Sequence, residues 1–332
     1  MSSDSQPGKK VRVAVVGAGD FGRNHIRVYQ ELEEAELVGI VDTDGGRAAR
    51  AAQEFSTQVL PGLDSLAGRV DAVSVAVPTV EHAQVGCRLL EMGFDVLVEK
   101  PMAASLADAD LLLAAAARHK RILQVGHLER FNPGFLAIQP VVARPLFFEV
   151  HRLGVFSPRS LDVDVVYDVM IHDLDILLAL VGAPVTEIKS IGIPVLTDKV
   201  DIAHARLEFE SGAVANITAS RVSTERVRKL RFFQQHEYIS VDYTRQDALR
   251  VRVVEPGPQP KFDFSNLPAV REEPLRAELR AFLVSARTRR TPAVDGAAGR
   301  RALELADRVM AGILEHARRV QLGTLVSPQV NG

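Results

Sequence analysis

The chain has 332 residues with 40 basic and 42 acidic side chains, and its formal net charge of −2 gives no electrostatic case for binding a nucleic acid or an anionic membrane. Cys87 is the only cysteine, which excludes a disulfide framework and a cysteine-based zinc site. No apolar run reaches the ~20 residues that a membrane helix needs, and residues 1–10 lack the apolar core of a signal peptide, so we expect a cytoplasmic protein with a disordered tail over residues 1–10.

Residues 11–126 alternate between strand-like and helix-like segments. Short apolar runs rich in β-branched residues indicate buried strands, and the longer stretches between them indicate helices. The predicted strands are 11–16, 37–41, 72–77, 94–98 and 122–125, and the predicted helices include 45–55, 79–92 and 105–119, with Thr79 and Ser105 as candidate caps. This alternation is typical of a parallel sheet with crossover helices.

Residues 127–330 follow a different pattern and are predicted to form a second domain. A helix-like stretch, 166–181, precedes five strand candidates without intervening helices: 185–193, 202–209, 213–220, 226–233 and 237–242. Such a succession predicts an open, mostly antiparallel sheet. The Pro- and Gly-rich residues 253–268 are predicted to be a loop, and two helices, 275–289 and 297–320, follow. The fold class is therefore α/β, with a second domain of the α+β type.

A glycine pattern, G-x-G-x-x-G, follows the first predicted strand at Gly17, Gly19 and Gly22. The first glycine permits a tight turn, the second lets the backbone approach a pyrophosphate, and the third lets the next helix pack close to the strand. Phosphate oxygens would bind the free N–H groups at the start of that helix, near Asp20 and Phe21. Glycines also serve ordinary turns, but strand, glycines, helix and second strand in register predict a Rossmann dinucleotide-binding domain over 11–126.

Asp42 ends the second predicted strand, 20 residues after Gly22. A carboxylate at this place accepts hydrogen bonds from the 2′-hydroxyl of an adenosine ribose and repels a 2′-phosphate. Thr43 and Asp44 supply no positive charge, and Arg47 is the nearest cation. The sequence therefore predicts NAD as the cofactor instead of NADP.

The carboxyl ends of two further strands carry polar residues. Ligands bind at this edge of an open parallel sheet, so we also place Pro78, Thr79, His82 and Glu99 in the predicted cofactor site. Lys100 directly follows a buried strand, and Pro101 favours an extended conformation for it. A lysine there can project beside the cofactor, although position alone favours an ordinary surface lysine at a strand end.

Three ionisable residues share a spacing within the helix-like stretch 166–181. Asp168, His172 and Asp175 are related by i, i+4 and i+7, which places them on one helix face. An imidazole flanked by carboxylates can act as a general base near neutral pH. The same triplet can instead bind a divalent metal or form an ordinary polar helix face.

The segments VAVVGAGDFG, VEKP and D-x-x-x-H-x-x-D occur in an order and at separations that resemble the Gfo/Idh/MocA family over residues 11–320. The resemblance implies an NAD(P)-dependent oxidoreductase of sugars, inositols and related polyols, which assembles as a homodimer or homotetramer through an open sheet. Lys100 matches the catalytic lysine of the E-K-P motif, and Asp168 and His172 match the residues that complete the active site. Met170 stands where the family often has glycine, which favours a subgroup.

Residues 125–133, Val-Gly-His-Leu-Glu-Arg-Phe-Asn-Pro, narrow the resemblance. Together with D-V-M-I-H-D they are similar to members that oxidise UDP-N-acetylglucosamine at C3, giving a 3-keto sugar for an aminotransferase in the lipid A diamino-sugar pathway. Arg130, Arg152 and Arg159 can pair with a diphosphate. Alternatively, Arg130 pairs with Glu129 or a backbone carbonyl and Phe131 belongs to the core. The substrate site implied by the resemblance comprises Lys100, Arg130, Asn132, Arg152, Asp168 and His172.

In the implied reaction, NAD⁺ takes a hydride from a carbinol carbon, and His172, or Lys100 through it, removes the hydroxyl proton. Lys100 also stabilises the developing alkoxide, and no metal is required. Three alternatives stay open: a dehydrogenase of inositol or another free sugar, a non-catalytic NAD-sensing protein, and a metal-dependent enzyme that uses Asp168, His172 and Asp175. The presence of both Lys100 and His172 argues against the non-catalytic alternative.

Overall fold

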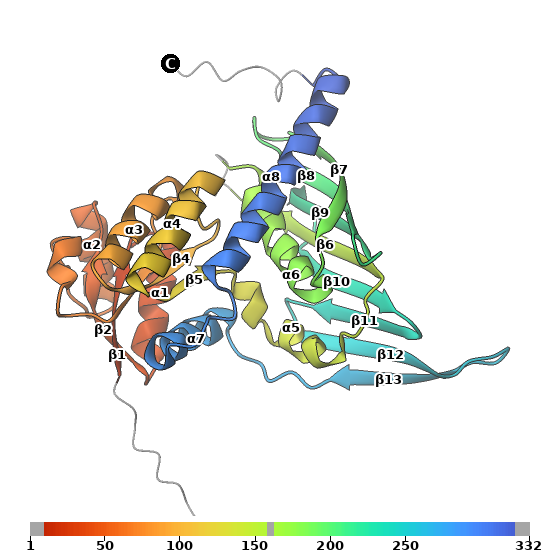
Figure 1. Ribbon diagram of the computed structural model, residues 1–332, viewed down its shortest axis with the longest axis horizontal. Coiled ribbons are helices and arrows are strands. Elements are labelled where there is room, and N and C mark those ends of the chain that lie inside the picture. Colours follow the sequence, from red (N-terminus) through yellow and green to blue (C-terminus); the bar gives the residue numbers. More distant parts are fainter. Residues whose placement is uncertain (1–9, 158–162, 323–332) are drawn as a thin grey trace, which may run out of the picture. The chain divides into compact units, whose positions relative to one another are not determined.

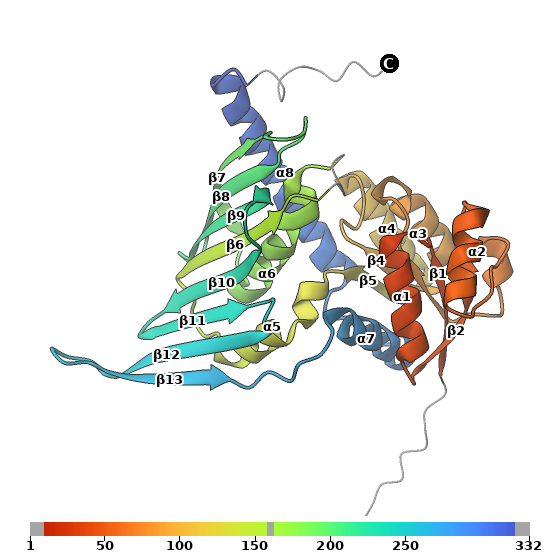
Figure 2. The same ribbon diagram turned by 180° about the vertical axis from the view of Figure 1, so that it is seen from behind.

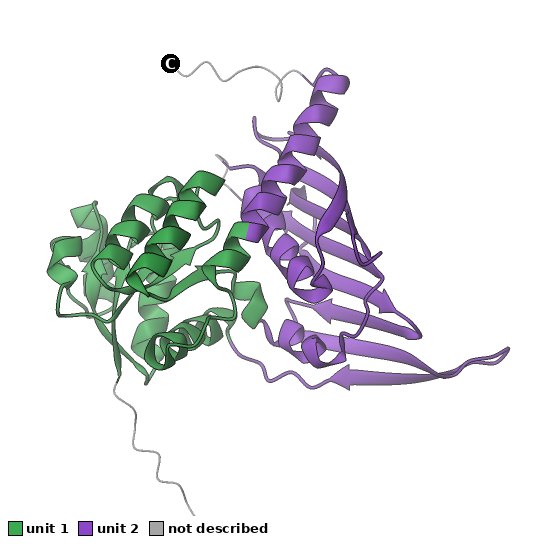
Figure 3. Cartoon of the chain, viewed as in Figure 1, with its two compact units in different colours: residues 1–131, 273–300 green, residues 132–272, 301–332 purple. Residues whose placement is uncertain are grey.

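The computed structural model describes residues 10–157 and 163–322 and divides into two compact units (Figures 1 and 3). Residues up to 131 and residues 273–300 form the first unit, and residues 132–272 and those from 301 onward form the second. Our sequence analysis placed 273–300 in the second domain, whereas the chain returns there to the first unit. Residues 1–9 of the expected tail and Arg159 lie outside the described residues.

The first unit contains a five-stranded parallel sheet in the order β2-β1-β3-β4-β5. Its strands are β1 (Val11–Val16), β2 (Ala35–Val41), β3 (Ala72–Val75), β4 (Asp95–Glu99) and β5 (Leu123–Gly126), and its helices include α1 (Asp20–Glu31), α2 (Gly45–Glu54), α3 (His82–Glu91) and α4 (Leu106–His119). The helices α3 and α4 pack side by side on one face of the sheet, as Figure 1 shows. Ser105 caps α4 as predicted, because its hydroxyl accepts the Asp108 N–H at 3.1 Å.

Helix α7 (Pro274–Thr288) packs against α1 on the other face of this sheet (Figure 2). Leu279, Phe282 and Leu283 of α7 are buried in one apolar cluster with residues of α1 and β1. Burial of these three side chains explains why 273–300 belongs to the first unit, since each contributes about 1.5–3 kcal/mol when removed from water.

The second unit contains an eight-stranded sheet in the order β13-β12-β11-β10-β6-β9-β8-β7. Neighbouring strands are antiparallel except for β6 and β9, which pair in parallel. The strands are β6 (Phe147–Val155), β7 (Val185–Ile193), β8 (Ile202–Phe209), β9 (Val214–Ser223), β10 (Val227–Gln234), β11 (Glu237–Asp242), β12 (Asp247–Glu255) and β13 (Lys261–Leu267). The predicted open, mostly antiparallel sheet is therefore confirmed.

The loop predicted for residues 253–268 is wrong at both ends. Strand β12 extends to Glu255, and β13 pairs with it, with Phe264 opposite Val251. The Pro and Gly residues that suggested a loop lie mainly in the turn between the two strands. Edge strand β13 alternates Phe262 and Phe264 with polar residues, a strand pattern that the neighbouring prolines obscured.

Helices α5 (Pro133–Ile138), α6 (Ile171–Val181) and α8 (Gly296–Arg319) contribute to the core of the second unit. Leu174 and Leu177 of α6 and Val309 and Ile313 of α8 are fully buried in one cluster with the sheet. These helices lie on one face of the sheet in both views of the ribbon (Figures 1 and 2). Within residues 10–157 and 163–322, no helix is both long enough and apolar enough to span a membrane.

Candidate active site

The glycine loop has the geometry that a dinucleotide needs. A Cβ atom on Gly17, where φ is +96°, would lie 2.4 Å from the Ala76 carbonyl oxygen, and one on Gly22 would lie 1.8 Å from the Gly17 oxygen. Glycine is therefore required at both positions. A Cβ atom on Gly19 would meet nothing within 4 Å, so the backbone at this turn is open to a bound group. Gly19 precedes α1 without a side-chain cap, and the start of the helix at Asp20 and Phe21 offers N–H groups to a pyrophosphate.

The Asp42 carboxylate links the glycine loop to α2. It accepts hydrogen bonds from the backbone N–H groups of Ala18 at 2.7 Å and Asp44 at 2.8 Å. The Arg47 guanidinium donates to both carboxylate oxygens, at 2.9 and 2.8 Å. Burial alone would raise the pKa of Asp42, but these bonds, led by the one from Arg47, lower it below its usual range. The Asp42 carboxylate therefore lies at the end of β2, as the sequence analysis predicted, and it is paired with Arg47.

His82 is buried beside the carboxyl ends of β3 and β4 and contacts backbone carbonyl groups there. The predicted helix 79–92 begins with a 3₁₀ turn, Thr79–Glu81, so Thr79 caps nothing and α3 starts at His82. The imidazole is 1% exposed; its Nδ1 lies 2.9 Å from the Pro101 carbonyl oxygen and its Nε2 lies 3.0 Å from that of Val77. The burial lowers the pKa of His82. His82 thus joins the segments that follow β3 and β4, while Pro78 is exposed and Thr79 half-buried beside them.

Glu99 and Lys100 follow each other at the end of β4 but differ in surroundings. Lys100 is half-buried, whereas Glu99 is 6% exposed and its Oε1 lies 2.8 Å from His25 Nε2. Glu99 is therefore buried beneath the predicted cofactor edge and paired with a histidine. Sequence reasoning missed His25, although its place three residues after Gly22 and four before Tyr29 marks the buried face of α1.

Glu278 of α7 is a third ionisable group in this interior. Its side chain is fully buried, and neither carboxylate oxygen has a hydrogen-bond partner among the residues that the structure describes. Burial, reinforced by the charge of Glu99, raises the pKa of Glu278 well above its usual range. The interior of the first unit therefore favours the protonated form of Glu278.

A Glu278→Gln variant should be more stable than the wild type, by a margin that grows with pH. Above the ordinary glutamate pKa, the unfolded chain releases a proton that folded Glu278 retains because its pKa is raised. The wild-type free energy of unfolding then falls by about 1.4 kcal/mol per pH unit until the folded acid ionises. Glutamine has no such proton. Urea unfolding at a series of pH values measures the difference, and a margin that does not change with pH would contradict the retained proton.

The three ionisable residues Asp168, His172 and Asp175 lie in two successive helical segments of different geometry. Residues Val166–Met170 form a π-helical turn that contains Asp168, and α6, which contains His172 and Asp175, follows directly. The wider turn alters the i, i+4 relation between Asp168 and His172 that a continuous α-helix would give. Asp168 and His172 are half-buried and Asp175 is buried. Short π-helical turns are frequent at functional sites, which keeps Asp168 and His172 as candidates.

Arg152 and Asn132 have structural roles in the second unit. The Arg152 guanidinium donates to both Asp173 oxygens, at 2.7 and 2.8 Å, and this pair is buried. Its charge is thus neutralised, and we leave Arg152 out of the proposed substrate site. Asn132 caps α5 by accepting the Gly134 N–H at 3.0 Å and donates to the Tyr243 carbonyl oxygen, so it is also a support.

Arg130, in the first unit, is half-buried and donates to the Ala293 carbonyl oxygen at 3.2 Å. Phe131 is buried. Both observations correspond to the alternative in which this segment is structural. In the described parts of the chain, no group of three or more His, Cys, Asp or Glu side chains is arranged to hold a metal ion.

Residues 11–127 match the sequence model described as the oxidoreductase family with an NAD-binding Rossmann fold, and residues 152–239 match that of the GFO/IDH/MocA C-terminal domain. A UDP-N-acetylglucosamine 3-dehydrogenase from Acidithiobacillus ferrooxidans is 36% identical over 312 residues, which cover 91% of this chain and 97% of the relative. The chain belongs to the Gfo/Idh/MocA family.

The chain is also similar to other dehydrogenases and to solved structures. Inositol 2-dehydrogenase 2 of Paenarthrobacter aurescens is 34% identical over 200 residues, covering 54% of this chain and 58% of the relative. A solved structure of the Acidithiobacillus enzyme has a TM-score of 0.87 at 34% identity, covering 92% of this chain and 97% of that one. Levoglucosan dehydrogenase in complex with NADH and levoglucosan has a TM-score of 0.83 at 17% identity and shares the fold.

Membership of the Gfo/Idh/MocA family makes this chain an oxidoreductase with an NAD-binding Rossmann domain at residues 11–127. The predictions of fold class, enzyme class and cofactor are therefore confirmed. The open backbone at Gly19 and the carboxylate at Asp42 fit that cofactor.

Proposed function

We propose that the chain oxidises a ring hydroxyl of a nucleotide sugar with NAD⁺, at C3 of UDP-N-acetylglucosamine. The observation that carries this proposal is the 36% identity to a UDP-N-acetylglucosamine 3-dehydrogenase over nearly the full length of both chains. The second candidate, an inositol dehydrogenase, has support from the 34% identity to inositol 2-dehydrogenase 2, but over 54% of this chain. A 3-keto product would suit an aminotransferase, as in the lipid A diamino-sugar pathway.

In the proposed reaction, Lys100, Asp168 and His172 would have separate roles. NAD⁺ supplies the acceptor for the hydride that leaves the carbinol carbon. His172, in its neutral form, or Lys100 through it, removes the hydroxyl proton, and the Lys100 ammonium stabilises the developing alkoxide. Asp168 orients the imidazole. Their joint action rests on the E-K-P and D-x-x-x-H-x-x-D motifs of the family. On the resemblance to the UDP-sugar members, Arg130 would contact the diphosphate while it keeps its bond to the Ala293 carbonyl oxygen.

The substrate is tested by measuring NADH formation with UDP-sugars, free sugars and inositols, each with and without a chelator. We expect the highest kcat/KM with UDP-N-acetylglucosamine and a 3-keto product by mass spectrometry after borodeuteride reduction. A higher kcat/KM with an inositol would transfer the proposal to the second candidate. NAD binding without turnover on any of these compounds would favour the NAD-sensing alternative.

Replacing Asp42 with Ala should weaken NAD binding by about tenfold and narrow the preference for NAD over NADP. The variant loses the acceptor for the ribose hydroxyl and frees the Arg47 guanidinium, which can then pair with a 2′-phosphate. Titration of both cofactors by fluorescence measures the change, and an Arg47→Ala variant is the control for the freed cation. If the wild type bound NADP at least as tightly as NAD, the assignment of Asp42 would be wrong.

A His172→Asn variant should lose turnover more than substrate binding. If His172 is the base, wild-type kcat/KM should rise with pH as the imidazole becomes neutral, and the variant should lack this acidic limb. His236→Asn, which changes an exposed histidine in the turn between β10 and β11, is the matched control. A chelator should have no effect. Loss of activity with a chelator and recovery with zinc or manganese would instead make Asp168, His172 and Asp175 metal ligands.

We also propose that the chain forms a homodimer or homotetramer through its open sheet. Outward-facing side chains on the sheet of the second unit include the exposed Ile191, Ile193, Phe233, Phe262 and Phe264. Apolar side chains in such number are typical of surfaces that pair with another chain. Sedimentation of the wild type and of a Phe262→Glu, Phe264→Glu double variant tests this, and a monomer in both would contradict it.

A further inference from the structure

Glu99, the residue before Lys100, and three ionisable side chains that interact with it are buried, and the proposed reaction uses none of the four. His25 lies on α1, His82 begins α3, Glu99 ends β4 and Glu278 lies on α7. Their exposed fractions are 0%, 1%, 6% and 0%. Burying ionisable groups costs free energy unless they are paired, so a set of this size in one interior calls for a specific role.

One chain of contacts reaches Lys100 from its N-terminal side. His25 Nε2 lies 2.8 Å from Glu99 Oε1, and the other oxygen, Oε2, accepts the backbone N–H of Lys100 at 3.2 Å. The carboxylate also lies against β5, since a Cβ atom on Gly126 would be 2.9 Å from the carboxyl carbon and both oxygens. The His25 imidazole, the Glu99 carboxylate and the Lys100 backbone amide therefore form one chain of contacts. The carboxylate is closely packed against Gly126.

A second contact reaches Lys100 from its C-terminal side. His82 Nδ1 lies 2.9 Å from the carbonyl oxygen of Pro101, the residue after Lys100, and its Nε2 lies 3.0 Å from the carbonyl oxygen of Val77. Each neighbour of Lys100 in the chain thus contacts a buried histidine. The Lys100 side chain itself is half-buried, and the position of its backbone determines where this long side chain starts.

The two buried acids, Glu99 and Glu278, differ in which protonation state their surroundings favour. Burial alone would raise the pKa of Glu99, but the hydrogen bond and charge of His25 lower it below the usual range. Burial and the charge of Glu99 raise the pKa of Glu278, so the surroundings favour the neutral form of that acid. Among the described residues, further titratable groups that interact with these acids include Tyr29 from α1, His82 and Lys100. The surroundings thus favour the ionised form of Glu99, whose Oε2 accepts the Lys100 N–H at 3.2 Å.

We propose that His25 and His82 are positioning residues for Lys100, which they hold from both sides through Glu99 and the Pro101 carbonyl. The proposal rests on the proposed function in assigning chemistry to Lys100. A displacement of about 1 Å in a reacting group can cost on the order of 10²-fold in rate, so loss of either contact should lower turnover without removing a group that touches substrate.

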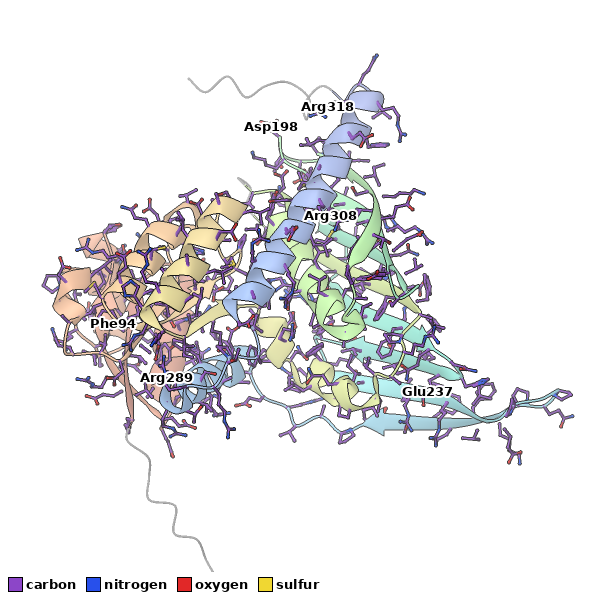
Figure 4. All side chains as sticks on the ribbon, viewed as in Figure 1. Phe94, Asp198, Glu237, Arg289, Arg308 and Arg318 are labelled. Atoms are coloured by element: carbon purple, nitrogen blue, oxygen red, sulfur yellow. The ribbon has the colours of Figure 1, made fainter. Side chains whose placement is uncertain are left out.

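The matched control uses Asp95, a second buried carboxylate on the same strand as Glu99. Asp95 begins β4 as Glu99 ends it, is also buried, and pairs with Arg289 after the end of α7. Arg289 is labelled in Figure 4. An Arg289→Met variant therefore removes the partner of another buried carboxylate, at the end of β4 remote from Lys100.

The experiment compares His25→Leu, His25→Gln, His82→Leu and Arg289→Met with the wild-type protein. The first measurement, hydrogen exchange of the ligand-free protein followed by mass spectrometry, needs no substrate. We expect faster exchange in peptides that contain the Lys100 amide for His25→Leu and His82→Leu, with little change for Arg289→Met. His25→Gln, which keeps a donor for Glu99, should restore most of the protection.

The second measurement is turnover of UDP-N-acetylglucosamine with NAD⁺. We expect kcat to fall about 10- to 100-fold in His25→Leu and His82→Leu, with the dissociation constant of NADH within about threefold of the wild type. Arg289→Met should lower the melting temperature with kcat nearly unchanged. If His25→Leu does not fold, His82→Leu and His25→Gln carry the test.

Unchanged Lys100 exchange in both leucine variants would overturn the inference. So would a loss of kcat that follows melting temperature equally in all four variants. Failure of the proposed function looks different: a Lys100→Met enzyme would stay active, or UDP-N-acetylglucosamine would not react, while the exchange result would stand.

Discussion

A Lys100→Met variant should lose turnover by about 10²- to 10⁴-fold while it still binds NAD, because methionine keeps the aliphatic length but removes both the ammonium charge and its proton. Lys100 directly follows β4, at the carboxyl edge of the sheet where Gly17 and Gly19 form their loop. NADH titration and kcat, measured on the same preparation, separate the two effects.

Lys120→Met is the control for the loss of a lysine from the first unit, since Lys120 is exposed at the end of α4 and its side chain has no predicted role. Turnover of this control should match the wild type. A Lys100→Met enzyme with a nearly normal kcat would remove Lys100 from the mechanism, and with it the reason for His25 and His82 to hold its backbone.

An Arg152→Met variant should be less stable than the wild type by about 3–5 kcal/mol, because it removes the arginine that pairs with the buried Asp173 carboxylate. If Arg152 were instead a ligand of the diphosphate, the main effect would be a higher KM in a protein of normal stability. Urea unfolding and substrate kinetics distinguish these outcomes.

A second substitution provides the control. Asp173→Leu, combined with Arg152→Met, removes both charges, and the double variant should recover a large part of the lost stability. Arg130→Met, which removes a half-buried arginine bound to a carbonyl oxygen, should cost far less stability and raise KM. Equal stability of Arg152→Met and the wild type would contradict the structural role.

Sequence reasoning succeeded where short segments determine the structure. The glycine loop is specified by backbone sterics within a few residues, and Ser105 caps the helix that it directly precedes. The helices α7 and α8 begin one residue before their predicted starts, because their apolar periodicity is regular. Strand β6 was missed because it pairs in parallel with β9, a partner that starts 67 residues after it (147 to 214), so no turn signal joins them.

In the candidate site, too, the sequence predicted what depends on neighbouring residues and missed contacts between distant ones. The positions of Gly19 and Lys100 follow from strand ends, but the partners of Arg152 and Glu99 lie 21 and 74 residues away in the chain. Because a free arginine and a neutralised one have the same sequence signature, Arg152 was expected to bind phosphate. His25 was missed for the related reason that a histidine on a buried helix face reveals no partner until the sheet is assembled.

The return of α7 to the first unit has a consequence for how the protein is made. The sheet of that unit is complete in the chain at Gly126, but the cluster that covers β1 and α1 also needs Leu279, Phe282 and Leu283. At about 5–20 residues per second, a ribosome reaches α7 roughly seven to thirty seconds after β5. During that time the nascent chain carries an uncovered apolar face, so the cofactor-binding unit completes its fold only after most of the second unit has been synthesised, and expressing residues 1–131 alone should give an aggregating fragment.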